Sequence, residues 1–191
     1  IGSVKVSTIN LRHIALEADG DKDKFFKTLE ERVRLDVDVL DTVRHIIKRN
    51  IEKGLLPQFT SGLMNMDTMY NTIGITALYE CVAEFGGIGE DEFGNKFYTD
   101  DGLAFATKVL DEIKRVKDSY DLDYSINVEA IPGESANVKL CSKDNLLYPE
   151  KDRGYFIYSN QWIPLMEKCT LQEKIRLGSV LDNACEGGVI A

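Results

Sequence analysis

The stretch YSINVEAIPGESANVKL, Tyr124 to Leu140, decides the fold. Its first half alternates between two faces, as a half-buried strand does. One face carries Tyr124, Ile126, Val128 and Ala130, and the other carries Ser125, Asn127 and Glu129. Pro132 and Gly133 then stop the strand, and the residues after them begin a helix. A strand that turns directly into a helix is typical of an α/β fold with a parallel sheet.

The helix start in this stretch has the chemistry of an anion site. The backbone N–H groups of Glu134, Ser135 and Ala136 lie in a first helical turn and have no partner within the helix. Those donors, together with the positive end of the helix dipole, suit a phosphate group. The alternative is an ordinary helix cap, because the Glu134 carboxylate can itself occupy the donors.

Composition limits the partners of the chain. It has 191 residues, of which 43% are hydrophobic, so we treat residues 1–191 as a single unit with one core. The 23 basic and 32 acidic residues give a net charge of −9, without a basic run, which argues against a nucleic-acid polymer but leaves a small nucleotide possible. We find no apolar run of membrane-spanning length and no signal peptide, and we expect a cytoplasmic protein.

The cysteines and the two chain ends give further expectations. Cys81, Cys141, Cys169 and Cys185 lie far apart without a C-x-x-C pair, so we predict reduced thiols and no metal site in this segment. The chain starts at Ile1 in a segment that already reads as a strand, and it stops at Ala191 as GGVIA begins another. We therefore expect an excerpt of a longer chain, truncated at both ends.

Periodicity predicts the remaining elements. Strands are expected at Val4–Ile9 and Tyr155–Ser159, and a buried strand or turn at Thr72–Ile75. Helices are expected from Phe26 to Ile51, from Ala77 to Phe85, from Thr99 onwards and from the Thr170–Glu173 capping box onwards. The acidic, glycine-bearing segment from Ile88 to Tyr98 is expected to be a surface loop.

Two polar positions at predicted strand ends have more than one interpretation. Asn10 follows the run SVKVSTIN and is well placed to bind a ligand, because sites in parallel α/β folds collect at the carboxyl ends of strands. It could equally be a turn residue. Trp162 could stack on a base or ribose, although packing is the more common role of a lone tryptophan.

Five motifs, in order, resemble the anaerobic, class III ribonucleoside-triphosphate reductases. They are Ile9–Ala18 (INLRHIALEA), Thr72–Glu80 (TIGITALYE), Val128–Leu140 (VEAIPGESANVKL), Tyr158–Leu165 (YSNQWIPL) and the CxGG pattern in Ala184–Ala191 (ACEGGVIA). The resemblance implies a ten-stranded α/β barrel made of two parallel half-barrels, of which this chain would supply part. It also implies a glycyl radical that passes its electron hole to a cysteine, which abstracts hydrogen from the substrate ribose.

The resemblance assigns roles to particular residues. Asn10 resembles the asparagine that contacts ribose hydroxyls. Pro132, Gly133, Glu134, Ser135 and Ala136 resemble the turn and helix start that receive the substrate phosphates. Glu129, on the polar face just before that turn, is our candidate to polarise or deprotonate a ribose hydroxyl, because carboxylates facing desolvated pockets have raised pKa values suited to proton transfer. A structural ion pair is the alternative for Glu129.

The sequence also departs from the family pattern. Many relatives have a Pro-Arg pair where this chain has Arg12 and His13, so an anion contact by Arg12 is not carried over. The finger-loop cysteine, the four-cysteine zinc site, the arginine-rich context of the radical glycine and the ATP-cone domain are missing from these residues, and neither Gly187 nor Gly188 is proposed as the radical carrier. We therefore expect this polypeptide alone to be inactive.

The leading hypothesis is a reductase segment that supplies ribose and phosphate contacts for a ribonucleoside triphosphate. For the complete enzyme, the resemblance implies an activase with an iron-sulfur cluster and S-adenosylmethionine, a structural zinc and a homodimer. The alternatives are another glycyl-radical enzyme of the formate-lyase type, whose pocket lacks a phosphate site, and a non-catalytic nucleotide-binding or assembly subunit.

Overall fold

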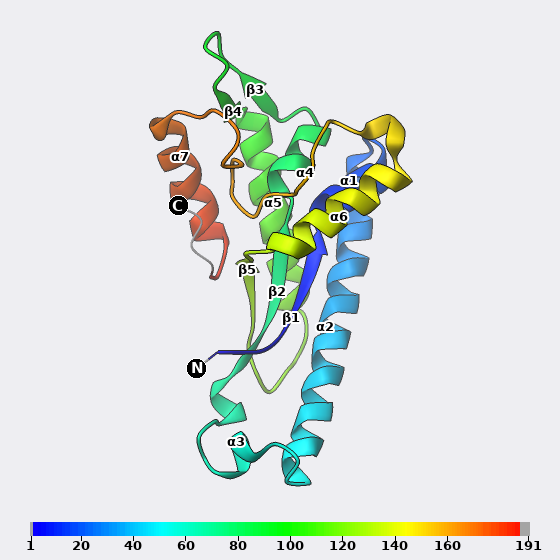
Figure 1. The fold of residues 1–191 in the computed structure, drawn as a ribbon, viewed down its shortest axis with the longest axis vertical. Helices are drawn as coiled ribbons and strands as arrows, with labels where there is room; N and C mark the ends of the chain where they lie inside the picture. Colours follow the sequence, from blue (N-terminus) through cyan, green and yellow to red (C-terminus); the bar gives the residue numbers. More distant parts are fainter. Residues whose placement is uncertain (1, 188–191) are drawn as a thin grey trace.

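Three parallel strands form the centre of the molecule, and the computed structural model describes residues 2–187. The strands are β1 (Ser3–Asn10), β2 (Tyr70–Thr76) and β5 (Ile126–Ala130), in the spatial order β1-β2-β5. The helices are α1 (Leu11–Ala18), α2 (Lys22–Glu52), α3 (Pro57–Thr60), α4 (Leu78–Glu84), α5 (Asp100–Lys117), α6 (Glu134–Leu147) and α7 (Leu171–Leu177) (Figure 1). Short helical turns at Met66–Thr68, Pro149–Lys151 and Gly178–Asp182 complete the chain, with a hairpin of β3 (Ile88–Glu90) and β4 (Lys96–Tyr98).

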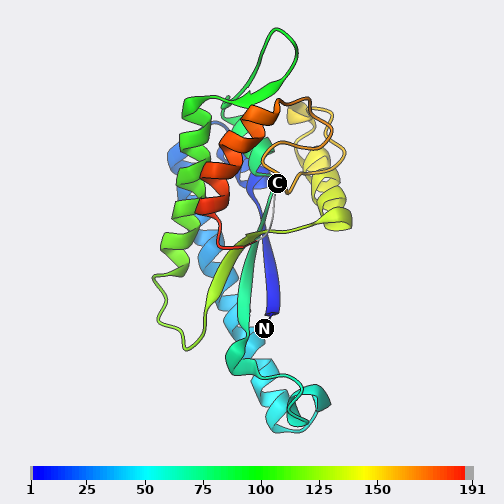
Figure 2. The same ribbon diagram turned by 90° about the vertical axis from the view of Figure 1, so that its left-hand side faces the viewer.

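The two faces of the sheet differ as the alternation of the sequence predicts. Along β5, Ile126, Val128 and Ala130 are buried, whereas Asn127 and Glu129 on the other face are only partly covered. The apolar face packs against α2 and α5, which lie together on one side of the sheet, while α6 lies on the other side (Figures 1 and 2). One face of the sheet therefore builds the core, and the opposite face carries polar groups.

Helix α2 buries the predicted apolar stripe, except that Phe25 instead of Phe26 is its first buried residue. Phe25 is fully buried and Phe26 only partly, because Phe25 packs against both Phe85 and Phe105, with ring centroids 5.3 and 5.5 Å away. The stripe continues through residues spaced three or four apart, as far as Leu40. Beyond that point the helix extends past the sheet, as Figure 1 shows, and Ile47 and Ile51 are only half-buried.

The segment from Ile88 to Tyr98 is a β-hairpin, and the prediction of a surface loop was wrong. The Asp91 carboxylate accepts the backbone N–H groups of Phe93 and Asn95 at 2.9 and 2.8 Å, which shapes the turn between the strands. Tyr98, at the end of the hairpin, is buried, and its hydroxyl donates to the Trp162 carbonyl oxygen. The many charges and glycines of the turn hid two strands of three residues each.

The run from Tyr155 to Ser159 forms no strand, so this prediction was also wrong. Its backbone pairs with no strand of the described residues: the Tyr158 N–H donates to the Asn137 carbonyl, and the Ser159 carbonyl accepts the Ala77 N–H at 2.9 Å, just past the end of β2. An apolar, alternating run becomes a strand only where another strand can pair with it.

Several other predicted boundaries are confirmed. Thr99 caps α5 and Thr170 caps α7, each through a side-chain oxygen that accepts a backbone N–H. The capping box at α7 is only half formed, because the Glu173 carboxylate accepts the Tyr98 N–H instead of the Thr170 N–H. Gly187 pairs in parallel with Glu129, and the rest of the predicted last strand lies outside the described residues.

The α/β class with parallel strands is confirmed by this architecture. The described sheet has three parallel strands, so it does not by itself form the ten-stranded barrel. Within residues 2–187, every helix is too short or too polar to cross a lipid bilayer.

Candidate functional site

The carboxyl ends of the three parallel strands meet at one edge of the sheet. Asn10 pairs with Thr76, and Ile75 pairs with Ala130, so β1, β2 and β5 end at nearly the same level. Helix α6 crosses this edge on the side opposite α2 and α5 (Figures 1 and 2). This is the edge at which parallel α/β sheets bind ligands.

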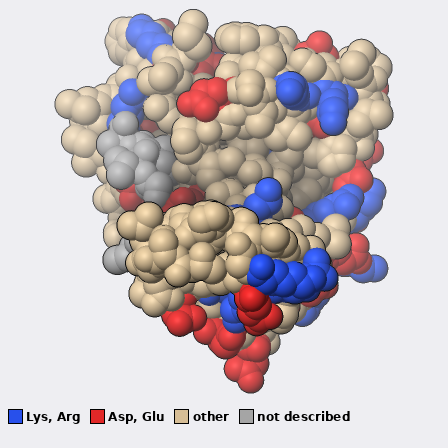
Figure 3. Space-filling model, turned by 60° about the horizontal axis from the view of Figure 1, so that its bottom comes forward, with Lys and Arg blue, Asp and Glu red and all other residues tan. Residues whose placement is uncertain are grey.

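Glu129 lies on the polar face of the sheet, as the alternation predicts. Its carboxylate accepts the Asn127 side-chain N–H at 2.5 Å, and Asn127 in turn accepts the Thr72 hydroxyl at 2.7 Å. Glu129 on β5 pairs with Gly74 on β2. A Cβ added at Gly74 would lie 2.8 Å from a methyl carbon of Ile131. The surface is hollowed across the middle when the molecule is seen from its lower end (Figure 3). Because position 74 is a glycine, the Ile131 side chain has room to pack against β2 at the residue that pairs with Glu129.

The first turn of α6 leaves backbone donors free. No side chain caps this helix, and the N–H groups of Ala136 and Asn137 both donate to the Gly133 carbonyl, at 2.7 and 3.1 Å. The N–H groups of Glu134 and Ser135 have no protein partner within residues 2–187. Pro132 and residues 134–136 are exposed. The Glu134 carboxylate does not occupy the donors, so this turn can accept an anion.

Gly133 is required at this turn for steric reasons. A Cβ there would lie 2.2 Å from the side-chain oxygen of Asn137. Asn137 is buried, and that oxygen accepts the Thr76 hydroxyl at 3.0 Å, so it cannot move away freely. The contact fixes the first turn of α6 to the end of β2.

Asn10 connects the end of β1 to α6. Its side-chain oxygen accepts the His13 N–H at 3.2 Å and so caps α1, while its side-chain nitrogen donates to the Asp144 carboxylate at 2.9 Å. The structure therefore brings Asn10 together with the helix that begins at Glu134. Glu129 makes its side-chain hydrogen bond with Asn127 and contacts neither Asn10 nor that first turn through hydrogen bonds of the described residues.

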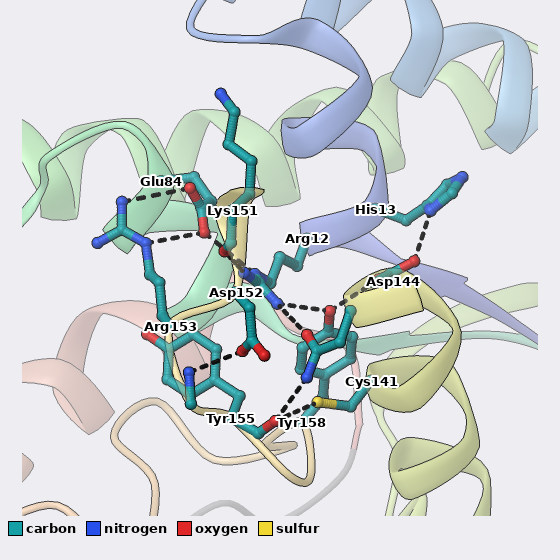
Figure 4. Close-up of polar contacts among 12 residues, drawn as sticks. Arg12, His13, Glu84, Cys141, Asp144, Lys151, Asp152, Arg153, Tyr155 and Tyr158 are labelled. Atoms are coloured by element: carbon teal, nitrogen blue, oxygen red, sulfur yellow. Dashed lines mark hydrogen bonds and ion pairs between the residues drawn. The ribbon is translucent and has the colours of Figure 1, made fainter. Parts of the chain in front are cut away.

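Sequence reasoning missed a buried polar network behind these residues (Figure 4). Arg12 is only 1% exposed, and its guanidinium donates to Glu84 at 3.1 Å, to the Tyr158 hydroxyl at 2.9 Å and to the Lys151 carbonyl at 2.8 Å. The guanidinium also lies 5.0 Å from the Tyr155 ring centroid. Arg12 is thus engaged by protein groups and is not free to bind an anion. The one signal in the sequence was an arginine inside the apolar run LRHIAL.

Asp144 is the centre of this network. Its carboxylate is buried and accepts hydrogen bonds from Asn10, from the Tyr158 hydroxyl at 2.7 Å and from His13 Nδ1 at 2.7 Å. Burial alone would raise the pKa of Asp144, but the hydrogen bonds from these three side chains lower it below its ordinary value. The hydrogen bond to Asp144 raises the pKa of His13, against the opposing effect of burial. Each group thus favours the charged form of the other.

A second buried carboxylate lies near the end of β2. Glu80 on α4 accepts the Ser159 N–H at 2.8 Å, and burial raises the pKa of Glu80 to about 7. This contact holds the segment after Tyr158 against α4. In the same segment, the Trp162 ring is buried and its N–H donates to Asp182 at 2.7 Å, so Trp162 has the packing role.

The His13 pair predicts a pH-dependent stability. A raised folded pKa means that the contribution of His13 is complete below its ordinary pKa of 6.5 and is lost as the pH rises through the raised value. The contribution of Asp144 is present above its ordinary pKa and is lost only in strong acid, as the pH falls through the lowered value. We expect His13→Gln to remove part of the stability loss that sets in as the pH rises above about 6.5, measured by hydrogen exchange of α1 and α6 amides.

The control for that prediction is His45→Gln. His45 is exposed on α2 and does not contact Asp144, so the same substitution there should leave the exchange of α1 and α6 amides as in the wild type. Equal profiles for wild type and His13→Gln would contradict the pairing of His13 with Asp144.

The described residues offer no metal site. Within residues 2–187, no group of three or more His, Cys, Asp or Glu side chains could hold a metal ion. The four cysteines are free thiols, and burial raises the pKa of Cys141 and of Cys185 to about 11. These residues do not fit the structural zinc that the resemblance implies for the complete enzyme.

Comparisons with known proteins decide the family. The family model described as "Anaerobic ribonucleoside-triphosphate reductase" matches residues 1–191. The chain belongs to this reductase family. Similar solved structures include the anaerobic ribonucleotide reductase of Thermotoga maritima with citrate in the active site, which is 40% identical, with a TM-score of 0.91, over 99% of this chain and 35% of that chain.

Two further structures of the Thermotoga maritima reductase contain nucleotides. One has dATP bound in the specificity site and the other is a complex with dATP and CTP, both at 40% identity with a TM-score of 0.91 over 99% of this chain. The chain described here spans 32% and 31% of those two chains, about a third of their length. No curated protein sequence matches it. The five motifs of the sequence therefore identified the family correctly.

Proposed function

We propose that this chain is part of an anaerobic ribonucleotide reductase and supplies contacts to the ribose and phosphates of a ribonucleoside triphosphate. The observation that carries the proposal is the first turn of α6. Its free N–H groups lie at the carboxyl edge of the parallel sheet, on the helix to which Asn10 is hydrogen-bonded. Family membership and the nucleotides in the solved relatives support the same reading.

Each candidate residue has a distinct role in this proposal. The N–H groups of Glu134 and Ser135, with the helix dipole, bind the phosphates, and Pro132, Gly133 and Ala136 shape that turn. The Asn10 amide hydrogen-bonds the ribose hydroxyls. Glu129 on the polar face exchanges a proton with a ribose hydroxyl.

The complete protein is proposed to contain what these residues lack. The sheet described here would form part of a ten-stranded α/β barrel, and the complete chain would act as a homodimer in the cytoplasm. A glycyl radical, installed by an activase with an iron-sulfur cluster and S-adenosylmethionine, would supply the oxidising radical, and a zinc site would lie outside these residues. The chain described here would be inactive alone.

The phosphate site is tested by removing one N–H group from the complete protein. Ser135→Pro deletes a backbone donor in the first turn of α6, a position where proline is tolerated. We expect CTP affinity to fall by about ten- to hundredfold, because one hydrogen bond to a charged phosphate is lost. Affinity for cytidine, which has no phosphates, should stay the same. Calorimetric titration of both ligands, with dATP present to fill any specificity site, measures this.

Asp101→Pro is the matched control. Asp101 occupies the equivalent position in the first turn of α5, a helix on the opposite side of the sheet from α6 (Figures 1 and 2), so it carries the same backbone change away from the proposed site. Its CTP affinity should equal that of the wild type. Unchanged CTP binding by Ser135→Pro would exclude α6 as the phosphate site, and would leave a reductase with its phosphates elsewhere or a lyase-type pocket.

A further inference from the structure

The orientation of the Asn10 amide is fixed at both ends. Its oxygen accepts the His13 N–H at 3.2 Å, and its nitrogen donates to Asp144 at 2.9 Å. A flipped amide would place its oxygen against the carboxylate and its NH₂ group against the His13 N–H. One N–H and one lone pair of Asn10 remain for a ligand, in a single orientation.

Asp144 is itself held from several directions. The Tyr158 hydroxyl and His13 Nδ1 each donate to it at 2.7 Å, and Arg12 donates to the same Tyr158 hydroxyl at 2.9 Å. Figure 4 shows these side chains converging from α1, α6 and the segment after α6. A buried carboxylate with this many donors cannot rotate without leaving some of them unpaired.

Asp144 lies on the same helix as the proposed phosphate site. It follows Glu134 by ten residues along α6, which corresponds to about 15 Å of helix. The helix start is tied to the sheet by the Thr76 to Asn137 hydrogen bond, and Asp144 ties the far part to Asn10. A rigid helix with a fixed contact at each end sets the spacing between the phosphate donors and the Asn10 amide.

We propose that Asp144 is a positioning residue that orients the Asn10 amide toward the ribose, at the spacing from the phosphate donors that α6 sets. This inference rests on the proposed function, because it requires a nucleotide at the sheet edge. Asp144 touches no substrate atom itself. Its effect is on sugar recognition, so it changes the preference for a ribose over a sugar without hydroxyls.

The experiment measures sugar preference in the complete protein. The dissociation constants of CTP and of 2′,3′-dideoxy-CTP are measured in three proteins: wild type, Asp144→Asn and Asn10→Ala. The ratio of the two constants gives the preference for CTP in each protein, and dATP is present throughout. Asn10→Ala removes one neutral hydrogen bond to the ribose and should lower the preference for CTP by about two- to tenfold, and Asp144→Asn, which weakens the hydrogen bond that orients the amide, should lower it by no more than that. Dideoxy-CTP, which keeps its phosphates, should bind all three proteins equally.

The double variant separates positioning from a general structural role. If Asp144 acts through Asn10, then Asn10→Ala with Asp144→Asn should lose no more preference than either single variant. Additive losses, or equal weakening of both nucleotides, would overturn the inference. Asp111→Asn, an exposed aspartate on α5, is the charge-matched control and should keep the wild-type ratio.

A second variant, Asp144→Glu, tests the inference if Asp144→Asn does not fold. Asp144→Glu keeps the charge beside His13 but displaces the carboxylate by one methylene from Asn10, so the preference should fall as in Asp144→Asn. Full preference in a folded Asp144→Glu or Asp144→Asn protein would refute the inference alone. Absence of any CTP preference in the wild type would instead refute the proposed ribose contact.

Discussion

Replacing Arg12 with methionine is expected to destabilise the region around α1 and α6 by about 3–5 kcal/mol, the cost of removing one partner from a buried ion pair. Arg12 is 1% exposed, and its loss would leave the Glu84 carboxylate, 8% exposed, without its buried partner. The Tyr158 hydroxyl and the Lys151 carbonyl would each lose a charged donor as well. Methionine fills part of the volume but cannot donate a hydrogen bond.

The matched control is Arg153→Met. Arg153 binds the same Glu84 carboxylate at 3.0 Å, but its side chain is 48% exposed, so its removal should cost at most about 1 kcal/mol. Hydrogen exchange of α1 and α6 amides in the complete protein measures both losses locally. Equal exchange rates in the two variants would contradict the role of Arg12 in holding these helices together.

Replacing Glu129 with glutamine is expected to lower turnover by about 10²- to 10⁴-fold, the usual contribution of an acid or base group. Glutamine keeps the shape of the side chain and still accepts the Asn127 hydrogen bond, but it cannot exchange a proton. Binding of CTP should therefore change little. Deoxyribonucleotide formation by the activated complete enzyme, compared with CTP affinity, separates the two effects.

Glu134→Gln provides the contrast for Glu129. It also removes one carboxylate near the sheet edge, but from the exposed first turn of α6, where a negative charge opposes phosphate binding. We expect equal or tighter CTP binding with turnover retained. Wild-type turnover in Glu129→Gln would exclude Glu129 as the acid or base and leave it a structural role on the polar face.

The fold could be predicted where side-chain periodicity is strong and local. Helix α2 and strand β5 follow their apolar patterns because each buries one continuous face against the core. The hairpin at Ile88 was missed because its strands are short and its turn depends on the side chain of Asp91. The Tyr155 run was misread because a strand requires a pairing partner, which the local pattern does not reveal.

The candidate site was predicted only in part, for a related reason. Asn10, Glu129 and the α6 start were found because each follows or belongs to a recognisable strand or turn. The contacts between them were not, because they join distant positions: Arg12 and Tyr158 are 146 residues apart in the chain. A buried aspartate such as Asp144, in a helix with no strong apolar face, gives no periodic signal of its own.

The central claim is that the first turn of α6 binds the phosphates of a nucleotide whose ribose reaches Asn10. The most direct test is a crystal structure of the complete protein with CTP and dATP. We predict CTP phosphate oxygens within hydrogen-bonding distance of the Glu134 and Ser135 N–H groups, and a ribose hydroxyl on the Asn10 amide. A CTP molecule bound with its phosphates away from this turn would contradict the account.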